Sequence, residues 1–151
     1  MPQSLAQIYL HIVFSTKDRQ PFLKDQKVRL AVHRYLLGIC EQQGSPSISI
    51  GGVADHVHIA CRLSKTGSVS SLIKELKQGS STWIKTKFSN QNDFHWQSGY
   101  GAFSVSPSHL TVLTNYIANQ ESHHRRESFQ VEFRRLLRKY NIDFDERYVW
   151  D

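Results

Sequence analysis

The sequence predicts an α+β fold in which helices pack on one face of an antiparallel β-sheet. Three observations support this prediction. Short runs of alternating apolar and polar residues indicate strands, longer runs with apolar residues at helical spacing lie between them, and glycine-rich segments suit the connecting turns.

The first two elements are a strand and a helix. Within "AQIYLHIVFST", residues 6–16, Ile12 and Phe14 share one face of the predicted strand, and His11 and Val13 share the other. A helix is predicted next from apolar residues spaced three and four apart: Val28, Ala31, Val32, Tyr35, Leu36 and Ile39.

The middle of the chain predicts two adjacent strands and a second helix. Residues 47–51 and 56–63 have strand character, and the glycine-rich segment between them favours a tight antiparallel turn. The helix that follows has apolar residues at helical spacing: Val69, Leu72, Ile73 and Leu76. We expect Ser68 to cap its first turn and Gly79 to interrupt it.

The last third of the chain predicts strand segments and two further helices. Residues 94–106 alternate aromatic and small side chains, as strands do, and end at a serine-proline pair that favours the start of a helix. The third helix is expected from Pro107 to about Arg125, and the last one over residues 127–140.

The resulting order, β-α-β-β-α-β with appended helices, is that of a ferredoxin-like fold in a single domain spanning residues 1–151. In the strand at 56–63, Val57 and Ile59 would pack under the helices. His56 and His58 would then lie on the opposite face, where a ligand or a further helix can meet them.

Composition favours an acidic partner. The chain has 19 Lys and Arg against 13 Asp and Glu, a net charge of +6 and a pI of about 9.5, so nucleic acid is the leading candidate, although a solvated basic surface is also common. Cys40 and Cys61 have no zinc-site or disulfide-framework spacing. With no signal-like or membrane-spanning run, a cytoplasmic location is expected.

The residues best suited to chemistry are a histidine pair and a tyrosine. His56 and His58 point the same way from one strand, and Tyr116 and Gln120 are one helical turn apart. Two imidazole nitrogens and an amide oxygen could hold a metal ion with positions left for phosphate oxygens. Taken alone, however, the histidines could be solvated or hydrogen-bonded, and Tyr116 could simply pack its ring.

Several motifs together resemble one protein family. "HVHIA" followed by "NYIANQ" is similar to the His-hydrophobe-His and tyrosine motifs of the single-tyrosine HUH transposases, which mobilise IS200/IS605-type insertion sequences. Four neighbouring segments, "HIVFSTKDRQPFL", "SSTWIKTKF", "WQSGYGAFSVS" and "YIANQESHH", also resemble that family. The likeness therefore covers nearly the whole chain.

The resemblance implies a mechanism and a set of site residues. It implies that His56, His58 and Gln120 bind one Mg²⁺ or Mn²⁺, and that Tyr116, on a catalytic helix, attacks DNA to give a 5′-phosphotyrosine. It also implies single-stranded DNA substrates with hairpin ends, and a homodimer in which the helix carrying Tyr116 reaches the partner's histidine pair. For the dimer, strand edges near residues 98–105 are candidate contacts.

Other predictions rest on individual side chains. Candidate DNA contacts are Lys74, Lys77, Lys85, Lys87, Arg125 and Arg126, although a solvated helix face explains them nearly as well. The aromatic residues Phe94, Trp96, Tyr100 and Phe103 could stack on unpaired bases or belong to the core. His123 and His124 could contact phosphate, but a placement at a helix C-terminus is favoured.

Two other functions remain open at this point. One is an HUH nickase of replication or conjugation, a type that resembles larger chains. The other is a domesticated protein that binds nucleic acid without cleaving it. Binding alone has no need of a nucleophile, so the presence of Tyr116, Gln120 and both histidines favours the enzyme.

Overall fold

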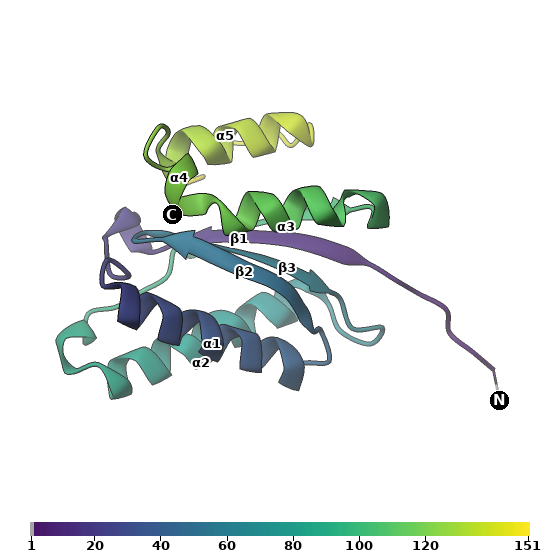
Figure 1. Cartoon of the computed structure of the whole chain (residues 1–151), viewed down its shortest axis with the longest axis horizontal. Helices are drawn as coiled ribbons and strands as arrows, with labels where there is room; N and C mark the ends of the chain where they lie inside the picture. Colours follow the sequence, from purple (N-terminus) through teal and green to yellow (C-terminus); the bar gives the residue numbers. More distant parts are fainter. Residues whose placement is uncertain (1) are drawn as a thin grey trace.

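The computed structural model describes residues 2–151 and has a four-stranded antiparallel sheet at its centre (Figure 1). The strands lie in the order β2-β3-β1-β4, which makes β2 and β4 the edges. Their bounds are β1 Tyr9–Ser15, β2 Ser47–Val53, β3 His56–Arg62 and β4 Gly101–Val105. The predicted α+β architecture is confirmed, with helices packed on one face of the sheet and the helix that carries Tyr116 on the other.

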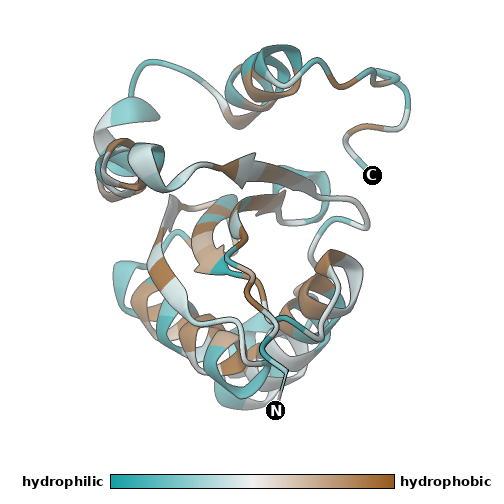
Figure 2. Ribbon diagram, turned by 90° about the vertical axis from the view of Figure 1, so that its right-hand side faces the viewer, coloured by the Kyte–Doolittle hydropathy of each residue, from teal (hydrophilic) through white to brown (hydrophobic). Residues whose placement is uncertain are grey.

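Helices α1, Gln26–Gln42, and α2, Val69–Lys87, pack side by side on the first face of the sheet (Figures 1 and 2). Their inward residues join those of β1 and β3 in one continuous apolar cluster, which includes Phe14, Leu36, Ile59 and Leu76, all fully buried. This cluster forms because alternate residues of each strand meet the apolar stripes of both helices. We call this side of the sheet the apolar face.

The prediction that Gly79 interrupts α2 is wrong. The helix runs unbroken through Gly79, where a Cβ atom would lie only 3.0 Å from Cδ1 of Ile39 on α1. The glycine thus allows α1 and α2 to approach closely. Ser68 caps α2 as expected, accepting a hydrogen bond from the Ser71 amide.

The second face of the sheet is covered by the helices of the C-terminal third: α3, Leu110–Ala118, α4, Gln120–His123, and α5, Phe129–Lys139 (Figure 1). The single helix predicted from Pro107 to Arg125 is therefore broken. A 3₁₀ turn at Pro107–His109 precedes α3, and Asn119, with non-helical φ and ψ of −99° and 18°, separates α3 from α4. We call this side the histidine face, because His11, His56 and His58 lie on it.

Residues 94–106 form less strand than predicted. Only Gly101–Val105 pairs with β1 as β4, and before it Trp96 makes a single bridge to Thr16. The stacking role considered for Phe94, Trp96 and Phe103 is corrected, because these side chains are buried and at most 8% exposed. The indole of Trp96 donates to the Ser80 hydroxyl, while Tyr100 remains 42% exposed.

Candidate active site

Strand β3 presents His56 and His58 on the histidine face, beneath α3, α4 and α5, and both rings are completely buried. The residues between and beside them, Val57 and Ile59, point into the apolar cluster on the opposite face. The strand alternation predicted from sequence is thus what aims both imidazoles at one place.

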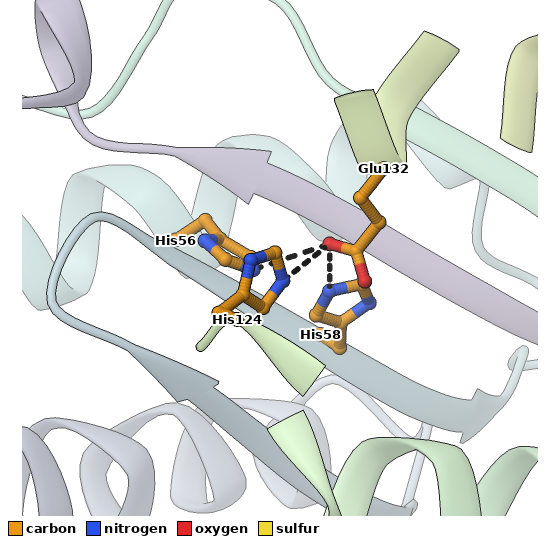
Figure 3. Close-up of side chains that lie close together, drawn as sticks. All are labelled: His56, His58, His124 and Glu132. Carbon is orange, nitrogen blue, oxygen red and sulfur yellow. Dashed lines mark hydrogen bonds and ion pairs between the residues drawn. The ribbon is translucent and has the colours of Figure 1, made fainter. Parts of the chain in front are cut away.

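That place is occupied by one oxygen of Glu132, which reaches down from α5 (Figure 3). Oε1 of Glu132 lies 3.0 Å from Nε2 of His58, 3.3 Å from Nε2 of His56 and 2.9 Å from Nε2 of His124. The carboxylate is completely buried. Strand β3, the end of α4 and helix α5 therefore converge on one carboxylate oxygen.

Tyr116 and Gln120 reach the same group from α3 and α4. The Tyr116 hydroxyl donates to Oε2 of Glu132, and the amide of Gln120 donates to the same oxygen at 3.1 Å. Oε1 of Gln120 lies 3.1 Å from Nε2 of His56. The residues predicted to form the active site thus lie together within one chain, even though a helix break separates Tyr116 from Gln120.

The outer nitrogen of each ring is also engaged. Nδ1 of His56 lies 2.7 Å from Oδ1 of Asp55, and Nδ1 of His124 lies 2.7 Å from the Glu127 carbonyl oxygen. Nδ1 of His58 lies 2.8 Å from Nε2 of His11. Facing the Glu132 carboxylate, each Nε2 donates a hydrogen bond to Oε1; a proton held at Nδ1 instead would leave the Nε2 lone pair free to bind a cation. These outer contacts therefore orient all three Nε2 atoms towards the centre of the site.

Burial and hydrogen bonding shift the pKa values of the buried residues at the centre of the site. Burial lowers the pKa of His56, but its hydrogen bonds to Asp55 and Glu132 outweigh that effect and raise the pKa overall. His58 has only one carboxylate beside it, and burial lowers its pKa to about 4. Burial would raise the pKa of Glu132, yet the hydrogen bonds of the surrounding histidines hold it well below its usual range. Glu132 is therefore an anion in the folded protein.

The donor set fits a divalent cation. His56, His58, His124 and Glu132 each offer a ligand atom, and these atoms lie within 4.8 Å of one another. The carboxylate and amide oxygens suit Mg²⁺ and Mn²⁺, whereas the imidazole nitrogens also suit transition metals such as Zn²⁺. Histidines that bind metals usually donate their other ring N–H to an acceptor, which fixes the orientation of the ring. Asp55 is such an acceptor for His56.

The position of α3 depends on a residue without a side chain. At Gly51 in β2, a Cβ atom would lie 2.5 Å from the carbonyl oxygen of Ile117 in α3. Any larger residue would clash with the helix backbone rather than with a flexible side chain. Gly51 therefore sets how closely the helix of Tyr116 approaches the sheet.

The candidate DNA contacts lie in two separate regions. Lys74, Lys77, Lys85 and Lys87 are on α2, which covers the apolar face, away from the histidine cluster. The ammonium of Lys77 donates to the carbonyl oxygens of Gln97, Ser98 and Gly99, so it ties α2 to the segment before β4.

Arg125 and Arg126 are exposed in the turn between α4 and α5. Arg125 lines a groove of about 580 Å³ that also contains Arg19, Arg29 and His124. This groove borders the histidine cluster, whereas the lysines of α2 do not. The groove is also lined by three carboxylates, of Asp55, Glu121 and Glu127, and Arg29 pairs with Glu121 at 2.8 Å, so its charge is mixed.

Sequence reasoning missed Glu132 and His11 and placed His124 at a helix end. Glu132 lies on the inward stripe of α5 between Phe129 and Phe133, and an acidic residue on an apolar stripe was a signal that could have identified it. His11 alternates with apolar neighbours in β1, but nothing in the sequence indicated that it would contact His58.

No helix within residues 2–151 is long and apolar enough to cross a membrane.

Comparisons with known proteins agree on one family. The family model described as "Transposase IS200 like" matches residues 4–120. The transposase for insertion sequence element IS200 from Salmonella typhimurium is 30% identical over 115 residues, covering 73% of this chain and 74% of that protein, and the IS200 transposase of Salmonella typhi matches equally.

Two solved structures share the fold. A candidate transposase from Deinococcus radiodurans R1 superposes with a TM-score of 0.65 at 22% identity, covering 80% of this chain and 95% of that one. A REP-associated tyrosine transposase bound to a REP hairpin gives a TM-score of 0.58 at 13% identity, covering 82% and 74%. From the family match and the curated relatives, the chain belongs to the IS200-like transposase family.

Proposed function

We propose that this chain cleaves and rejoins single-stranded DNA at insertion-sequence ends, with Tyr116 as the nucleophile and a divalent cation, Mg²⁺ or Mn²⁺, held by His56, His58 and Gln120. The observation that carries the proposal is the convergence of these four side chains on one buried centre. The family supports a transposase, and the hairpin bound by one structural relative supports hairpin ends as the substrate.

The chemistry follows from the state of Tyr116. Burial and the adjacent Glu132 carboxylate raise the pKa of the phenol above its ordinary value, although Arg135 opposes this. The hydroxyl therefore stays protonated until positive charge and a phosphate are in place. When bound, the cation would polarise the scissile phosphate and stabilise the negative charge that develops on its oxygens.

In the cleavage step, the Tyr116 oxygen attacks phosphorus and forms a 5′-phosphotyrosine while the bond from phosphorus to the 3′ oxygen breaks. The phenolic proton leaves along the hydrogen bond to Glu132 and passes on to water, and the 3′ oxygen takes up a proton from water and is released as a hydroxyl. Because the new ester conserves the phosphodiester bond energy, a different 3′-hydroxyl can reverse the step and join new ends.

Tyr116→Phe tests the proposal, because it keeps the ring packed and removes only the nucleophile. We expect the wild type to form a denaturation-resistant adduct with labelled single-stranded DNA that carries an element end, and Tyr116→Phe to bind the same DNA without forming it. An adduct with Tyr116→Phe would show that the assignment is wrong. Binding by the wild type without any adduct would favour the domesticated, non-cleaving alternative.

Substrate form is tested on the same DNA. We propose preference for single strands over duplex, as the resemblance to the single-tyrosine transposases implies. The exposed Tyr100 and the arginine-lined groove are candidate contacts for unpaired bases and phosphates. Equal affinity for the duplex and single-stranded forms at matched salt would contradict this preference.

A further inference from the structure

We propose that Glu132 is a ligand of the same cation through Oε1 and positions the Tyr116 hydroxyl through Oε2, so that one carboxylate joins the metal site to the nucleophile. This inference rests on the metal-assisted function proposed above. It adds a residue from α5, beyond the segment that the family model matches, to the ligands that the sequence motifs indicate.

The first argument is the burial of Glu132. Its side chain is fully enclosed on the inward stripe of α5, between Phe129 and Phe133, where an apolar residue would complete the packing. Burying an unpaired carboxylate is very costly, so a residue of this kind persists only where positive charge or donors compensate. On the histidine face, that compensation comes from the ring nitrogens of β3 and α4.

The two carboxylate oxygens of Glu132 contact different groups. Oε1 faces Nε2 of His56, His58 and His124, whereas Oε2 accepts hydrogen bonds from Tyr116 and Gln120. In Figure 3 the carboxylate descends from α5 and meets the rings from the opposite side to the strand. A cation at the histidines would therefore have a carboxylate oxygen beside it.

Glu132 also connects the helices of the site to one another and to the sheet. Oε1 connects α5 to β3, and Oε2 connects α5 to α3 and α4, so Glu132 is shared by every element that contributes to the site. A cation bound through Oε1 would hold α5 against the sheet. The same contact would fix the carboxylate that orients the attacking oxygen, which makes Glu132 a positioning residue for Tyr116 as well as a ligand.

The test measures Mn²⁺ binding to the full chain without DNA, by electron paramagnetic resonance of the free ion. We expect Glu132→Gln to weaken binding by at least about tenfold, the scale on which lost metal-site partners act. Glu121→Gln is the matched control. It removes one negative charge near the same site, where Glu121 pairs with Arg29 in the groove that His124 also lines, but it leaves the convergent ligand atoms intact. We expect it to bind Mn²⁺ like the wild type.

A second measurement uses only the wild type and so does not depend on the folding of a variant. If Glu132 is a ligand, Mn²⁺ should slow hydrogen exchange of the amides of α5. Protection confined to β3 and α4, or equal Mn²⁺ affinity of Glu132→Gln, Glu121→Gln and the wild type, would overturn the inference while leaving the histidine site intact. An equal loss of affinity in both glutamine variants would also overturn it, because general electrostatics would then explain both. A wild type that binds no Mn²⁺ would contradict both this inference and the metal-assisted step.

Discussion

The two faces of the sheet are built on different principles. On the apolar face, residues of β1, β3, α1 and α2 form one continuous cluster. On the histidine face, two smaller apolar clusters lie apart, one around Phe129 and Phe133 under α5 and the other around Leu113 and Ile117 under α3. The buried polar site lies where they separate, so this face gives up apolar packing to hold charged and polar groups.

The hydrogen bonding of buried histidines differs between the two faces in the same way. His56 and His58 have partners on both ring nitrogens, whereas Nε2 of His33, buried on α1, has no hydrogen-bond partner among the described residues. The comparison teaches that the apolar face mainly stabilises the fold and the histidine face mainly serves chemistry.

Removing one imidazole of the site should have the largest effect. We expect His56→Ala to reduce adduct formation by at least about a thousandfold, because charge stabilisation at the phosphate is lost. Hairpin binding should persist, since it depends on phosphate and shape contacts elsewhere. The check is to compare adduct yield with affinity on one labelled DNA. Full cleavage in the presence of EDTA would argue against any metal role.

Tyr116 acts either with the histidine pair of its own chain or with that of a partner protomer. Family resemblance implies a homodimer in which Tyr116 reaches the partner's histidines, whereas in the single chain Tyr116 lies beside its own His58, with ring centroids 5.7 Å apart. Since β4 is an edge strand, it can pair across a two-fold axis. A shared site predicts that mixing His56→Ala with Tyr116→Phe protomers restores adduct formation. Heterodimers that form but stay inactive would show that each chain uses its own tyrosine.

Truncating the apolar face should cost stability and spare chemistry. Leu76 is fully buried in α2, and we expect Leu76→Ala to lower the free energy of unfolding by about 3 to 5 kcal/mol. Adduct formation per folded molecule should be unchanged. In the matched variant Leu113→Ala, which lies in the smaller cluster under α3, the loss should be about 2 kcal/mol and adduct formation should fall. Urea unfolding and adduct assays of both variants check this contrast.

The smallest effect concerns His33. Burial, with a minor contribution from Arg29, lowers the pKa of this imidazole to about 4. The unfolded chain therefore takes up a proton that the folded chain refuses, and stability is lost as pH falls from about 6.5 towards 4. We expect His33→Leu to remove about 1 to 2 kcal/mol of the difference in unfolding free energy between pH 7 and pH 5. An unchanged pH dependence would exclude His33 as its source.

The strands and the first two helices could be predicted because each rests on a local pattern. Alternation placed β1 and β3, and apolar spacing placed α1 and α2, within a few residues of their ends. The break at Asn119 could not be predicted in this way. No glycine or proline marks it, and residues 120–126 are all polar, so no local pattern locates the bend that lets α4 pack on the sheet.

The candidate site was predictable only in part for the same reason. His56, His58, Tyr116 and Gln120 lie in compact motifs, so their order was informative. His11 and Glu132 contribute through tertiary contacts with residues far away in the sequence, whereas Asp55 contacts its chain neighbour His56. No spacing rule relates β1 and α5 to β3, and only the folded sheet brings them together.

Gly51 contributes no atom to the site, yet a mutation of its codon should inactivate the site. Every missense change there adds at least a Cβ atom against the Ile117 backbone, so α3 must shift and carry Tyr116 with it. A genetic screen for copies that have lost mobility, but whose protein still accumulates and binds hairpins, should therefore recover Gly51 substitutions alongside those at the tyrosine. Such inactive alleles would keep both catalytic motifs intact, so sequence comparison of the motifs alone would not identify them.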